Sequence, residues 1–424
     1  MEDDLRRRVG AIYRIEAPKL VARLARLIGQ VGLAEELAHD ALVEALEHWS
    51  ADTLPENPGA WLMATAKRKA LDRMRRARVR ERESAAVSAD VELWREVSQP
   101  DLERDLDDDI GDELLRLMFV SCHPVLSKEA RVTLTLRLVG GLTTAEIARA
   151  FLVPEPTIAQ RVVRAKRALA DAKVPFEVPR RAELPERLAS VLEVLYFVFN
   201  EGYTATSGED WMRPALTEDA LRLGRVLASL VPDDSEVLGL VALMELQASR
   251  IGARTARDGT PILLLDQERS RWDRLLIERG LAGLDRAERI AGNERGPYHL
   301  QAAIAACHAR ARTPEATDWS RIAALYTALA NVLPSPVVEL NRAVALSMAF
   351  GPEVGLAHVD ALAEEPSLAN YHLLPSVRGE LLAKLGRFGE AARECARAAA
   401  LSENARERAL LERRAADYAR RAAS

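Results

Sequence analysis

The sequence predicts an all-α fold, and three observations support that class. Alanine, arginine, leucine and glutamate dominate the 424 residues, whereas aromatic residues make up only 5%. This composition favours helices over sheets. Apolar residues recur at helical spacing in most segments, and a capped pair of short helices is expected before the middle of the chain. The length allows two to four domains, each with its own hydrophobic core.

A first domain of three or four helices is expected over residues 1–82. The helix predicted over Leu33–Trp49 has apolar residues on one face and carboxylates at i, i+4 spacing on another. Solvation alone explains such an acidic strip, and a docking site for a basic partner is the alternative. The apolar residues are Leu33, Leu37, Ala41, Leu42, Ala45, Leu46 and Trp49, and the strip is Glu36, Asp40, Glu44 and Glu47.

The next helix is expected to start at Asn57-Pro58, a dipeptide typical of a turn that leads into a helix. Trp61 lies near its start, and residues 67–82 contain nine Lys or Arg against two acids. A helix with an apolar start and a following series of cations is well suited to contacts with nucleic-acid phosphates.

The charge then reverses in residues 83–113, which contain twelve acids against two arginines. Helical periodicity is lost over the same stretch, so it is predicted to be an acidic linker, extended or partly helical. The whole chain has a net charge of −5, which argues against binding nucleic acid by bulk charge alone.

A helix-turn-helix is predicted within a second domain, residues 114–173. Thr143 and Glu146 form a capping box at the start of one short helix, and Pro156 suits the first turn of the next. The second helix has an apolar face of Ile158, Val162, Ala165 and Leu169. Its opposite face carries Thr157, Gln160, Arg161, Arg164 and Arg167. Such a helix fits a DNA major groove, and a helical hairpin with a solvated arginine face is the alternative.

A long helical array is expected over residues 186–424. Its first helix, Pro185–Phe199, is predicted to end at Asn200 and Gly202, with the glycine as a left-handed cap. Small residues at Gly379, Gly386, Ala391 and Ala398, together with Phe388, resemble the spacing of a tetratricopeptide repeat, and a weaker copy lies about 35 residues upstream. Such arrays commonly present a concave surface to a peptide or protein.

The sequence offers no support for catalysis. It contains no phosphate-binding glycine loop, no Cys-x-x-Cys and no His-Glu-x-x-His, so no catalytic residue, metal or cofactor is expected. Glu201 and Tyr203 could suggest a catalytic pair, but they lack a partner base or nucleophile, so a structural turn is favoured. A regulatory role for this turn is the alternative. The turn consists of Asn200, Glu201, Gly202 and Tyr203. Three distant cysteines suit a reducing cytoplasm, and no stretch approaches the roughly 18 apolar residues of a membrane span.

Several motifs together resemble a known family. "AEELAHDALVEALEHW", "NPGAWLMATAKRKALDRMRR", an acidic spacer and "LTTAEIARAFLVPEPTIAQRVVRAKRAL" are similar, in order and spacing, to the extracytoplasmic-function sigma factors of the sigma-70 family. The match covers roughly the first 175 residues, far more than one helix-turn-helix supplies. The remainder resembles the subgroup with a tetratricopeptide-like C-terminal extension that begins near "FNEGY".

The resemblance implies a transcription initiation factor without catalytic chemistry, which binds core RNA polymerase and directs it to promoters. Residues 1–82 would be sigma region 2 and residues 114–173 sigma region 4, and the acidic linker would run toward the active-site cleft and RNA exit path of the polymerase. The beta-prime coiled coil and the beta flap would be the contacts on core polymerase. Implied residues are Glu36, Asp40 and Glu44 for polymerase; Asn57, Trp61, Lys67, Arg68, Arg73 and Arg76 for the −10 element; and Thr157, Gln160, Arg161, Arg164 and Arg167 for the −35 element.

Two positions depart from the family pattern. Many members have asparagine where this chain has Arg68, so the −10 base preference is not carried over. Pro156 replaces the usual glycine, which is expected to shift the start of the recognition helix slightly.

Two other interpretations remain at the level of sequence. One is a conventional helix-turn-helix activator or repressor with a tetratricopeptide-like sensor domain, which would bind its DNA site without polymerase. The other makes the C-terminal half an enzyme or a small-molecule receptor joined to a DNA-binding head. A sigma factor differs from both in that it initiates transcription when added to core polymerase.

Overall fold

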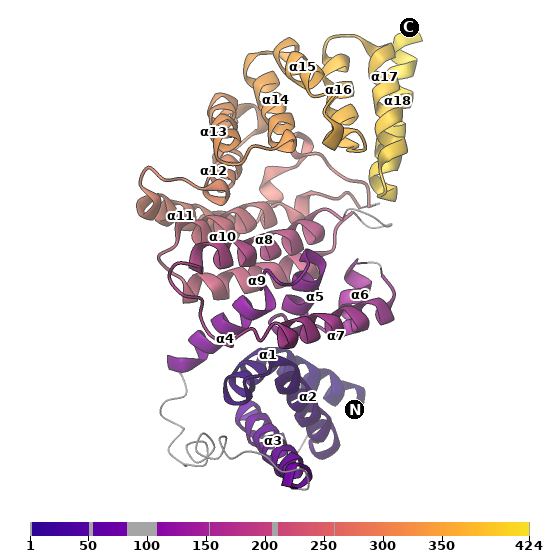
Figure 1. Ribbon diagram of the computed structural model, residues 1–424. Coiled ribbons are helices and arrows are strands. Elements are labelled where there is room, and N and C mark those ends of the chain that lie inside the picture. Colours follow the sequence, from indigo (N-terminus) through magenta and orange to yellow (C-terminus); the bar gives the residue numbers. More distant parts are fainter. Residues whose placement is uncertain are drawn as a thin grey trace. The chain divides into compact units, whose positions relative to one another are not determined.

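The computed structural model describes residues 2–50, 54–82, 108–151, 153–205, 211–257 and 259–423. The described residues form eighteen α-helices with short 3-10 turns between some of them, so the all-α prediction is confirmed (Figure 1). The chain divides into two compact units, Met1–Val194 and Leu195–Ser424. The boundary between the two units falls inside one helix, α8 (Leu184–Tyr203).

Three helices begin unit 1: α1 (Glu2–Ile28), α2 (Val31–His48) and α3 (Pro58–Arg82). They pack against one another around a core to which each contributes. The buried face of α2 is centred on Ala34, Leu37, Ala38, Ala41 and Ala45. Leu46 was predicted to lie on that face but is 45% exposed. The buried face of α2 is therefore narrower than the predicted apolar stripe.

Four further helices follow the linker: α4 (Asp108–Ser121), α5 (Lys128–Leu138), α6 (Thr144–Phe151) and α7 (Glu155–Asp171). Most of the predicted acidic linker, residues 83–107, lies outside the described residues. The last six linker residues belong to α4, which starts earlier than the predicted position at Leu114.

The first half of α8 belongs to unit 1. Ser190 Oγ donates to the Cys122 carbonyl oxygen at 2.7 Å, and Arg187 donates to the Phe119 carbonyl oxygen at 2.6 Å. Glu193 pairs with Lys128 Nζ at 3.1 Å. These contacts secure α8 to α4, to α5 and to the turn between them.

The predicted end of this helix at Asn200 is wrong. Helix α8 continues to Tyr203, and Gly202 has a helical conformation instead of a left-handed one. The glycine is needed for a close approach, since a Cβ there would lie 2.5 Å from the Thr217 backbone nitrogen and 2.9 Å from Leu216 Cβ. Gly202 therefore admits the start of α9 (Pro214–Leu230) and does not cap α8.

Unit 2 is a series of helices in which each packs against the next. Helices α13, α15 and α17 begin at residues 319, 352 and 388, near the tetratricopeptide period of about 34 residues. This spacing accords with the predicted repeat, whose class stays a prediction. The remaining helices are α10 (Ser235–Ala248), α11 (Arg274–Ala291), α12 (Pro297–Arg310), α13 (Trp319–Val332), α14 (Pro336–Phe350), α15 (Pro352–Ala361), α16 (Leu373–Lys384), α17 (Phe388–Leu401) and α18 (Ala405–Ala423).

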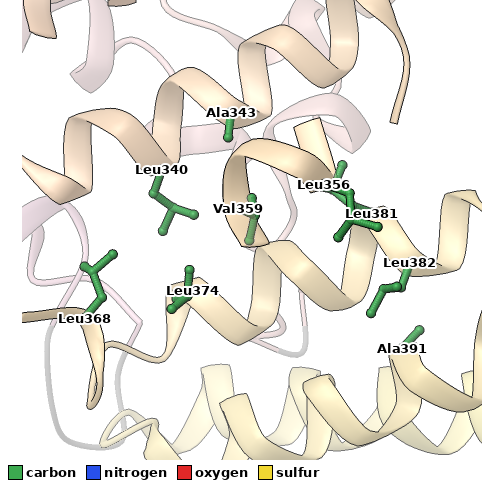
Figure 2. Close-up of a cluster of buried hydrophobic side chains, with 9 residues drawn as sticks. All are labelled: Leu340, Ala343, Leu356, Val359, Leu368, Leu374, Leu381, Leu382 and Ala391. Atoms are coloured by element: carbon green, nitrogen blue, oxygen red, sulfur yellow. The ribbon is translucent and has the colours of Figure 1, made fainter. Parts of the chain in front are cut away.

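The distal part of the array has a continuous apolar core, contributed by α14 to α17 and the short turn before α16 (Figure 2). Helices α16 and α17 cross closely at Gly379, where a Cβ would lie 3.0 Å from Cys395 Sγ and 3.2 Å from the Ala391 carbonyl oxygen. The predicted use of small residues at this crossing is confirmed. The cluster comprises Leu340, Ala343, Leu356, Val359, Leu368, Leu374, Leu381, Leu382 and Ala391.

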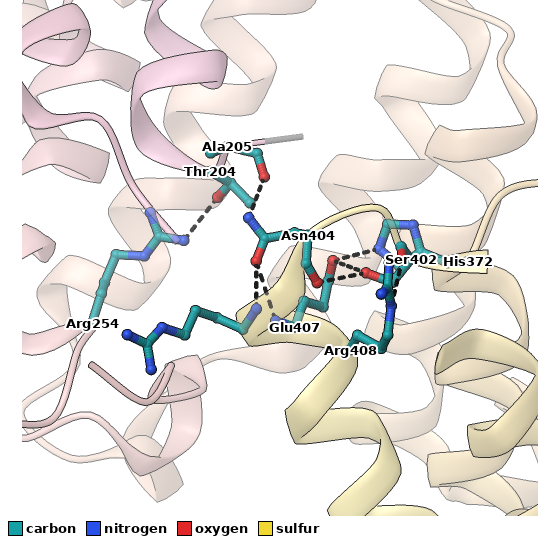
Figure 3. Close-up of polar contacts among 9 residues, drawn as sticks. Thr204, Ala205, Arg254, His372, Ser402, Asn404, Glu407 and Arg408 are labelled. Atoms are coloured by element: carbon teal, nitrogen blue, oxygen red, sulfur yellow. Dashed lines mark hydrogen bonds and ion pairs between the residues drawn. The ribbon is translucent and has the colours of Figure 1, made fainter. Parts of the chain in front are cut away.

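The residue just before α18 contacts the segment that follows α8. Asn404 Nδ2 donates to the Ala205 carbonyl oxygen at 3.2 Å, across 199 residues of sequence (Figure 3). The Asn404 Oδ1 atom accepts from the backbone N–H of Arg406 at 3.1 Å and of Glu407 at 3.2 Å, so the same side chain caps α18. Asn404 is 1% exposed, and it joins the two ends of the unit 2 array.

Candidate nucleic-acid interface

The helix-turn-helix is built by its predicted local signals. The Glu146 backbone N–H donates to Thr143 Oγ1 at 3.1 Å, and the Thr143 backbone N–H donates to Glu146 Oε2 at 2.8 Å. These two bonds are the reciprocal bonds of a capping box, and they fix the start of α6. Pro156 lies in the first turn of α7, where its missing N–H costs no helical hydrogen bond. Both predictions are confirmed.

Helix α7 has the two predicted faces. Its buried residues are Ile158, Val162, Ala165 and Leu169, as the spacing indicated. Thr157, Gln160, Arg164 and Arg167 are exposed on the other side. Arg161 differs, because it is half-buried and donates to Thr133 Oγ1 of α5 at 3.5 Å.

The exposed face of α7 has the chemistry needed to contact base edges. The side chains of Gln160 and Arg164 make no hydrogen bond or ion pair with another described residue. Arg167 pairs only with Asp171, one turn along, at 3.6 Å, and both side chains are exposed. Glutamine suits adenine and arginine suits guanine in a major groove. The available groups therefore match an interface for duplex DNA.

The start of α3 forms a second candidate surface. Asn57 Oδ1 accepts from the Ala60 backbone N–H at 3.0 Å, so Asn57 is the cap of α3. Trp61 packs edge-on against Trp49, with the ring centroids 5.1 Å apart. Trp49 is buried whereas Trp61 is half-buried, so Trp61 is held rigidly at the protein surface.

The cations of α3 face the acidic strip of α2. Glu44 pairs with Arg68 and, at 2.9 Å, with Lys69, while Glu36 pairs with Arg73 at 3.0 Å. The hydrogen bonds from Lys69 and then from Arg68 lower the pKa of Glu44. The sequence treated the strip and the cations as separate sites, and the structure brings them together.

These pairs are exchangeable because they are exposed. The Arg68 side chain is 62% exposed and the Arg73 side chain 56%. Exposed ion pairs contribute only about 0–1 kcal/mol each, so a phosphate group or a partner protein displaces them at little cost. The Asp40 side chain is exposed and forms no hydrogen bond or ion pair with another described residue.

Two predicted residues stand apart from this surface. Lys67 is half-buried near Arg23 and Glu113, and burial, followed by Arg23, lowers the pKa of Lys67. The side chain of Arg76 lies outside the described residues, although its backbone belongs to α3. The basic face that the structure describes therefore consists of Arg68, Lys69 and Arg73.

A buried carboxylate that the sequence interpretation missed connects the two candidate surfaces. Glu35 of α2 is 7% exposed and accepts from Arg137 Nε of α5 at 2.6 Å and from Lys166 of α7. Burial alone would raise the pKa of Glu35, but Lys166 and Arg137 outweigh burial and lower it. We call this group the Glu35 clamp. Its only sequence signal is the position of Glu35 beside Ala34 on the apolar face.

A second buried carboxylate secures α4 to α1. Glu113, 5% exposed, pairs with Arg26 at 3.1 Å and with Arg23 at 3.4 Å. The sequence placed Glu113 at the end of the acidic linker, as one of many solvated acids. Its burial shows that this end of the segment is structural.

The FNEGY segment is packed into unit 2. Glu201 is 6% exposed and pairs with Arg213. Tyr203 stacks on Phe199 with the ring centroids 5.7 Å apart. Asn200 accepts, through its carbonyl oxygen, from the Thr204 backbone N–H at 2.8 Å. The segment is therefore a helix end held by packing, as the structural interpretation expected, although it is not the predicted turn.

The described residues contain no group of three or more His, Cys, Asp or Glu able to hold a metal ion. The cysteines Cys122, Cys307 and Cys395 are free and buried. Burial raises the pKa of Cys122 to about 11. Among the helices as described, none is long and apolar enough to span a bilayer.

Family models match three parts of the chain. Sigma-70 region 2 matches residues 12–80, which span most of α1 to α3. Sigma-70, region 4 matches residues 116–169, which end in α7. A family of unknown function, DUF6596, matches residues 187–288. The two sigma-70 matches thus coincide with the two candidate surfaces.

Individual relatives differ in how much of the chain they cover. An uncharacterized protein, R00370, of Rhizobium meliloti (strain 1021) is 42% identical over 395 residues, covering 93% of this chain and 92% of the relative. The ECF RNA polymerase sigma factor SigL of Mycobacterium tuberculosis is 29% identical over 160 residues, which are 38% of this chain and 85% of SigL. The ECF RNA polymerase sigma factor SigK of Mycobacterium ulcerans (strain Agy99) is 32% identical over 159 residues, 37% of this chain and 81% of SigK.

Proposed function

We propose a role for each surface of the chain from one premise: the chain belongs to the extracytoplasmic-function sigma factors of the sigma-70 family. As such it is an initiation factor that binds core RNA polymerase and directs it to promoter DNA. A conventional helix-turn-helix regulator is not favoured, because the region 2 match gives α1 to α3 a role that such a regulator lacks. Since polymerase and promoters are cytoplasmic in bacteria, we propose the same location for this chain.

The exposed face of α7 would bind the −35 element. Thr157, Gln160 and Arg164 project away from the apolar face that secures the helix. Arg167 would contact a DNA phosphate after its weak ion pair with Asp171 breaks. Arg161 would leave Thr133 before reaching DNA. The single observation that carries the assignment is this exposed face, whose polar side chains lie opposite the buried residues that secure α7.

The start of α3 would bind the −10 element. Trp61, supported by Trp49, offers a rigid aromatic surface beside Asn57 for an unstacked base. Arg68 and Arg73 would exchange Glu44 and Glu36 for single-strand phosphates. Lys67 and Arg76 were also proposed from the family pattern, and Lys67 would first have to leave the vicinity of Glu113.

The acidic strip of α2 would bind the beta-prime coiled coil, and the helix-turn-helix module would contact the beta flap. Asp40 is the strongest candidate, since it is exposed and its charge has no described partner. Glu36 and Glu44 become available when DNA phosphates take their arginines. Binding of polymerase and of DNA would then support each other.

Asp40→Asn in the full chain tests the polymerase contact. The substitution removes one charge with little change in volume, so we expect at least about tenfold weaker binding to core polymerase and unchanged thermal stability. Affinity measured by fluorescence anisotropy, with Glu56→Gln as a matched exposed control, checks this. Equal affinity of the Asp40 variant and the control would refute the assignment.

We propose that unit 2 regulates initiation and, like the sigma-70 regions, catalyses nothing. A chain ending at Tyr203 would test regulation, because it keeps the half of α8 that contacts Cys122 and Phe119. We expect this chain to retain polymerase binding and to differ at least about threefold from the full chain in transcript yield. Unchanged yield, with circular dichroism showing a folded unit 1, would exclude a regulatory unit 2.

A further inference from the structure

Three arginines of unit 2 lie in a cluster without a described carboxylate partner. Arg250, Arg254 and Arg269 form no ion pair within the described part of the chain. Other arginines of the same unit do, as Arg213 with Glu201 and Arg225 with Glu245 show. Glu315 acts on Arg269 from beyond ion-pair distance, whereas Arg250 and Arg254 bring two further positive charges together without an ion pair to a described carboxylate.

Aromatic rings connect the three guanidinium groups into one row. Arg254 Cζ lies 3.5 Å from the ring centroid of Tyr203 and 5.5 Å from that of Trp211. Arg250 Cζ lies 5.7 Å from Tyr203 and 5.8 Å from Trp272, and Arg269 Cζ lies 5.0 Å from Trp272. The rings hold the cations by cation–π attraction but supply no negative charge. We call these six residues the arginine row.

The hydrogen bonds of the row go to neutral acceptors. Arg254 donates to the Tyr203 carbonyl oxygen. It also donates to Thr204 Oγ1 at 2.8 Å (Figure 3). Arg269 donates to the carbonyl oxygens of His308 and Ala311, at 2.6 Å each. Because Arg254 is only 6% exposed, its burial is unfavourable without a counter-charge. Burial accordingly lowers the pKa of Arg254 to about 10.

Several N–H groups of the row are buried and have no acceptor. They are Arg250 Nε, Arg269 Nε, Trp211 Nε1 and Trp272 Nε1. Indole and guanidinium nitrogens can only donate, so each of these groups lacks an acceptor oxygen. Buried polar groups are normally satisfied, and a group of unsatisfied donors next to unbalanced cations indicates that an anion is missing.

We propose that the arginine row binds a small oxyanion, a phosphate or carboxylate group of a small molecule, with Arg250 as its main ligand. The Arg250 side chain makes no hydrogen bond to a described residue, and both Arg250 and Tyr203 are half-buried, so solvent reaches them. Trp272 is 4% exposed, so the proposed ligand would approach from the side of Arg250 and Tyr203. The proposal does not depend on the sigma-factor assignment.

The row lies where ligand binding would affect the whole unit. Tyr203 ends α8, and Ala205, two residues later, accepts the hydrogen bond from Asn404 that returns the array to its start. Arg254 contacts Thr204 between them. An oxyanion at Arg250 would thus brace the junction between the first and last helices of unit 2.

Thermal unfolding of the full chain with inorganic phosphate or citrate, against chloride at equal ionic strength, tests the proposal. We expect one of the two anions to raise the unfolding midpoint of the wild type in a saturable manner, and the more effective anion distinguishes phosphate from carboxylate. Arg250→Gln should weaken the apparent affinity at least about tenfold, and Arg250→Lys should weaken it less. Arg257→Gln, an exposed arginine nearby, is the control and should respond like the wild type.

The same variants test the rival explanation, a counter-charge from Glu209, Asp210 or Asp258, which lie outside the described residues. A counter-charge within the chain would leave no site for an added anion, so neither phosphate nor citrate would raise the unfolding midpoint of the wild type. That outcome would assign the counter-charge to the chain itself and overturn the proposal. An equal anion response of all variants would do the same.

Discussion

Glu35 shows how a single buried side chain connects the two candidate nucleic-acid surfaces of unit 1. Its bond to Arg137 spans 102 residues of sequence and joins α2 to α5, while Lys166 joins it to α7. Gly32 of α2 also packs against Lys166, since a Cβ built at Gly32 would lie 3.6 Å from Lys166 Cδ. We propose that the Glu35 clamp holds the two promoter-binding modules together in the free factor and opens when polymerase separates them.

Glu35→Gln is expected to destabilise unit 1 by about 2 kcal/mol at pH 7, because it leaves two half-buried cations without their counter-charge. The pKa of Glu35 is lowered in the folded chain, so its contribution is present above the pKa of the unfolded carboxyl. That contribution is lost as the pH falls through the lower folded value, so wild type and variant should converge below about pH 4.3. Urea unfolding across pH measures this difference.

Glu36→Gln is the matched control for that experiment. Glu36 is the next residue, 56% exposed and paired with an equally exposed Arg73. Its loss should change the free energy of unfolding by less than about 1 kcal/mol. Equal effects of the two substitutions, or a Glu35 deficit that is no smaller at pH 3 than at pH 7, would mean that the clamp contributes nothing specific.

At the scale of elements, the sequence predicted best where local chemistry decides the structure. The α6 start followed from Thr143 and Glu146 because a capping box needs only neighbouring groups. The inward face of α7 followed from Ile158 and Val162 because helical periodicity is local. The candidate −35 surface was predictable for the same reason.

Prediction failed where distant segments decide. Gly202 suits a helix end in isolation, yet its actual role is to admit Thr217 and Leu216 of another helix. The acids of α2 and the cations of α3 were each recognised, but their pairing depends on how two helices pack. Glu35 could not be distinguished from its solvated neighbour Glu36 until α5 and α7 were in place.

Gly379→Val tests the close crossing of α16 and α17. Valine favours a helix slightly more than glycine does, but its Cβ would lie 3.0 Å from Cys395 Sγ and 3.2 Å from the Ala391 carbonyl oxygen. We expect the clash to dominate and to destabilise unit 2 by about 1–3 kcal/mol. Differential scanning calorimetry measures the loss.

Gly389→Val on α17 is the control, since a Cβ there meets only Ala422 Cβ at 4.0 Å. This variant should stay within about 0.5 kcal/mol of the wild type. Similar losses at both positions would show that the crossing at Gly379 is no tighter than the rest of the array.

At the scale of the whole molecule, charge is distributed in a way that suits a subunit of polymerase. The net charge of −5 gives the free chain little general attraction to DNA. The cation-rich helix α3 is partly neutralised by α2, because Glu44 and Glu36 pair with Arg68 and Arg73. We therefore expect polymerase to supply most of the DNA affinity and this chain to supply the choice of promoter.

The most direct test of the account is start-site mapping of transcripts made by core polymerase with the full chain. We expect start sites that share two upstream elements. We also expect Arg164→Ala to reduce their transcripts about tenfold or more, through loss of a base contact on the −35 element. The exposed control Arg181→Ala should leave them unchanged. Transcripts without shared upstream elements, or full activity of the Arg164 variant, would contradict the proposal that α7 selects the promoter.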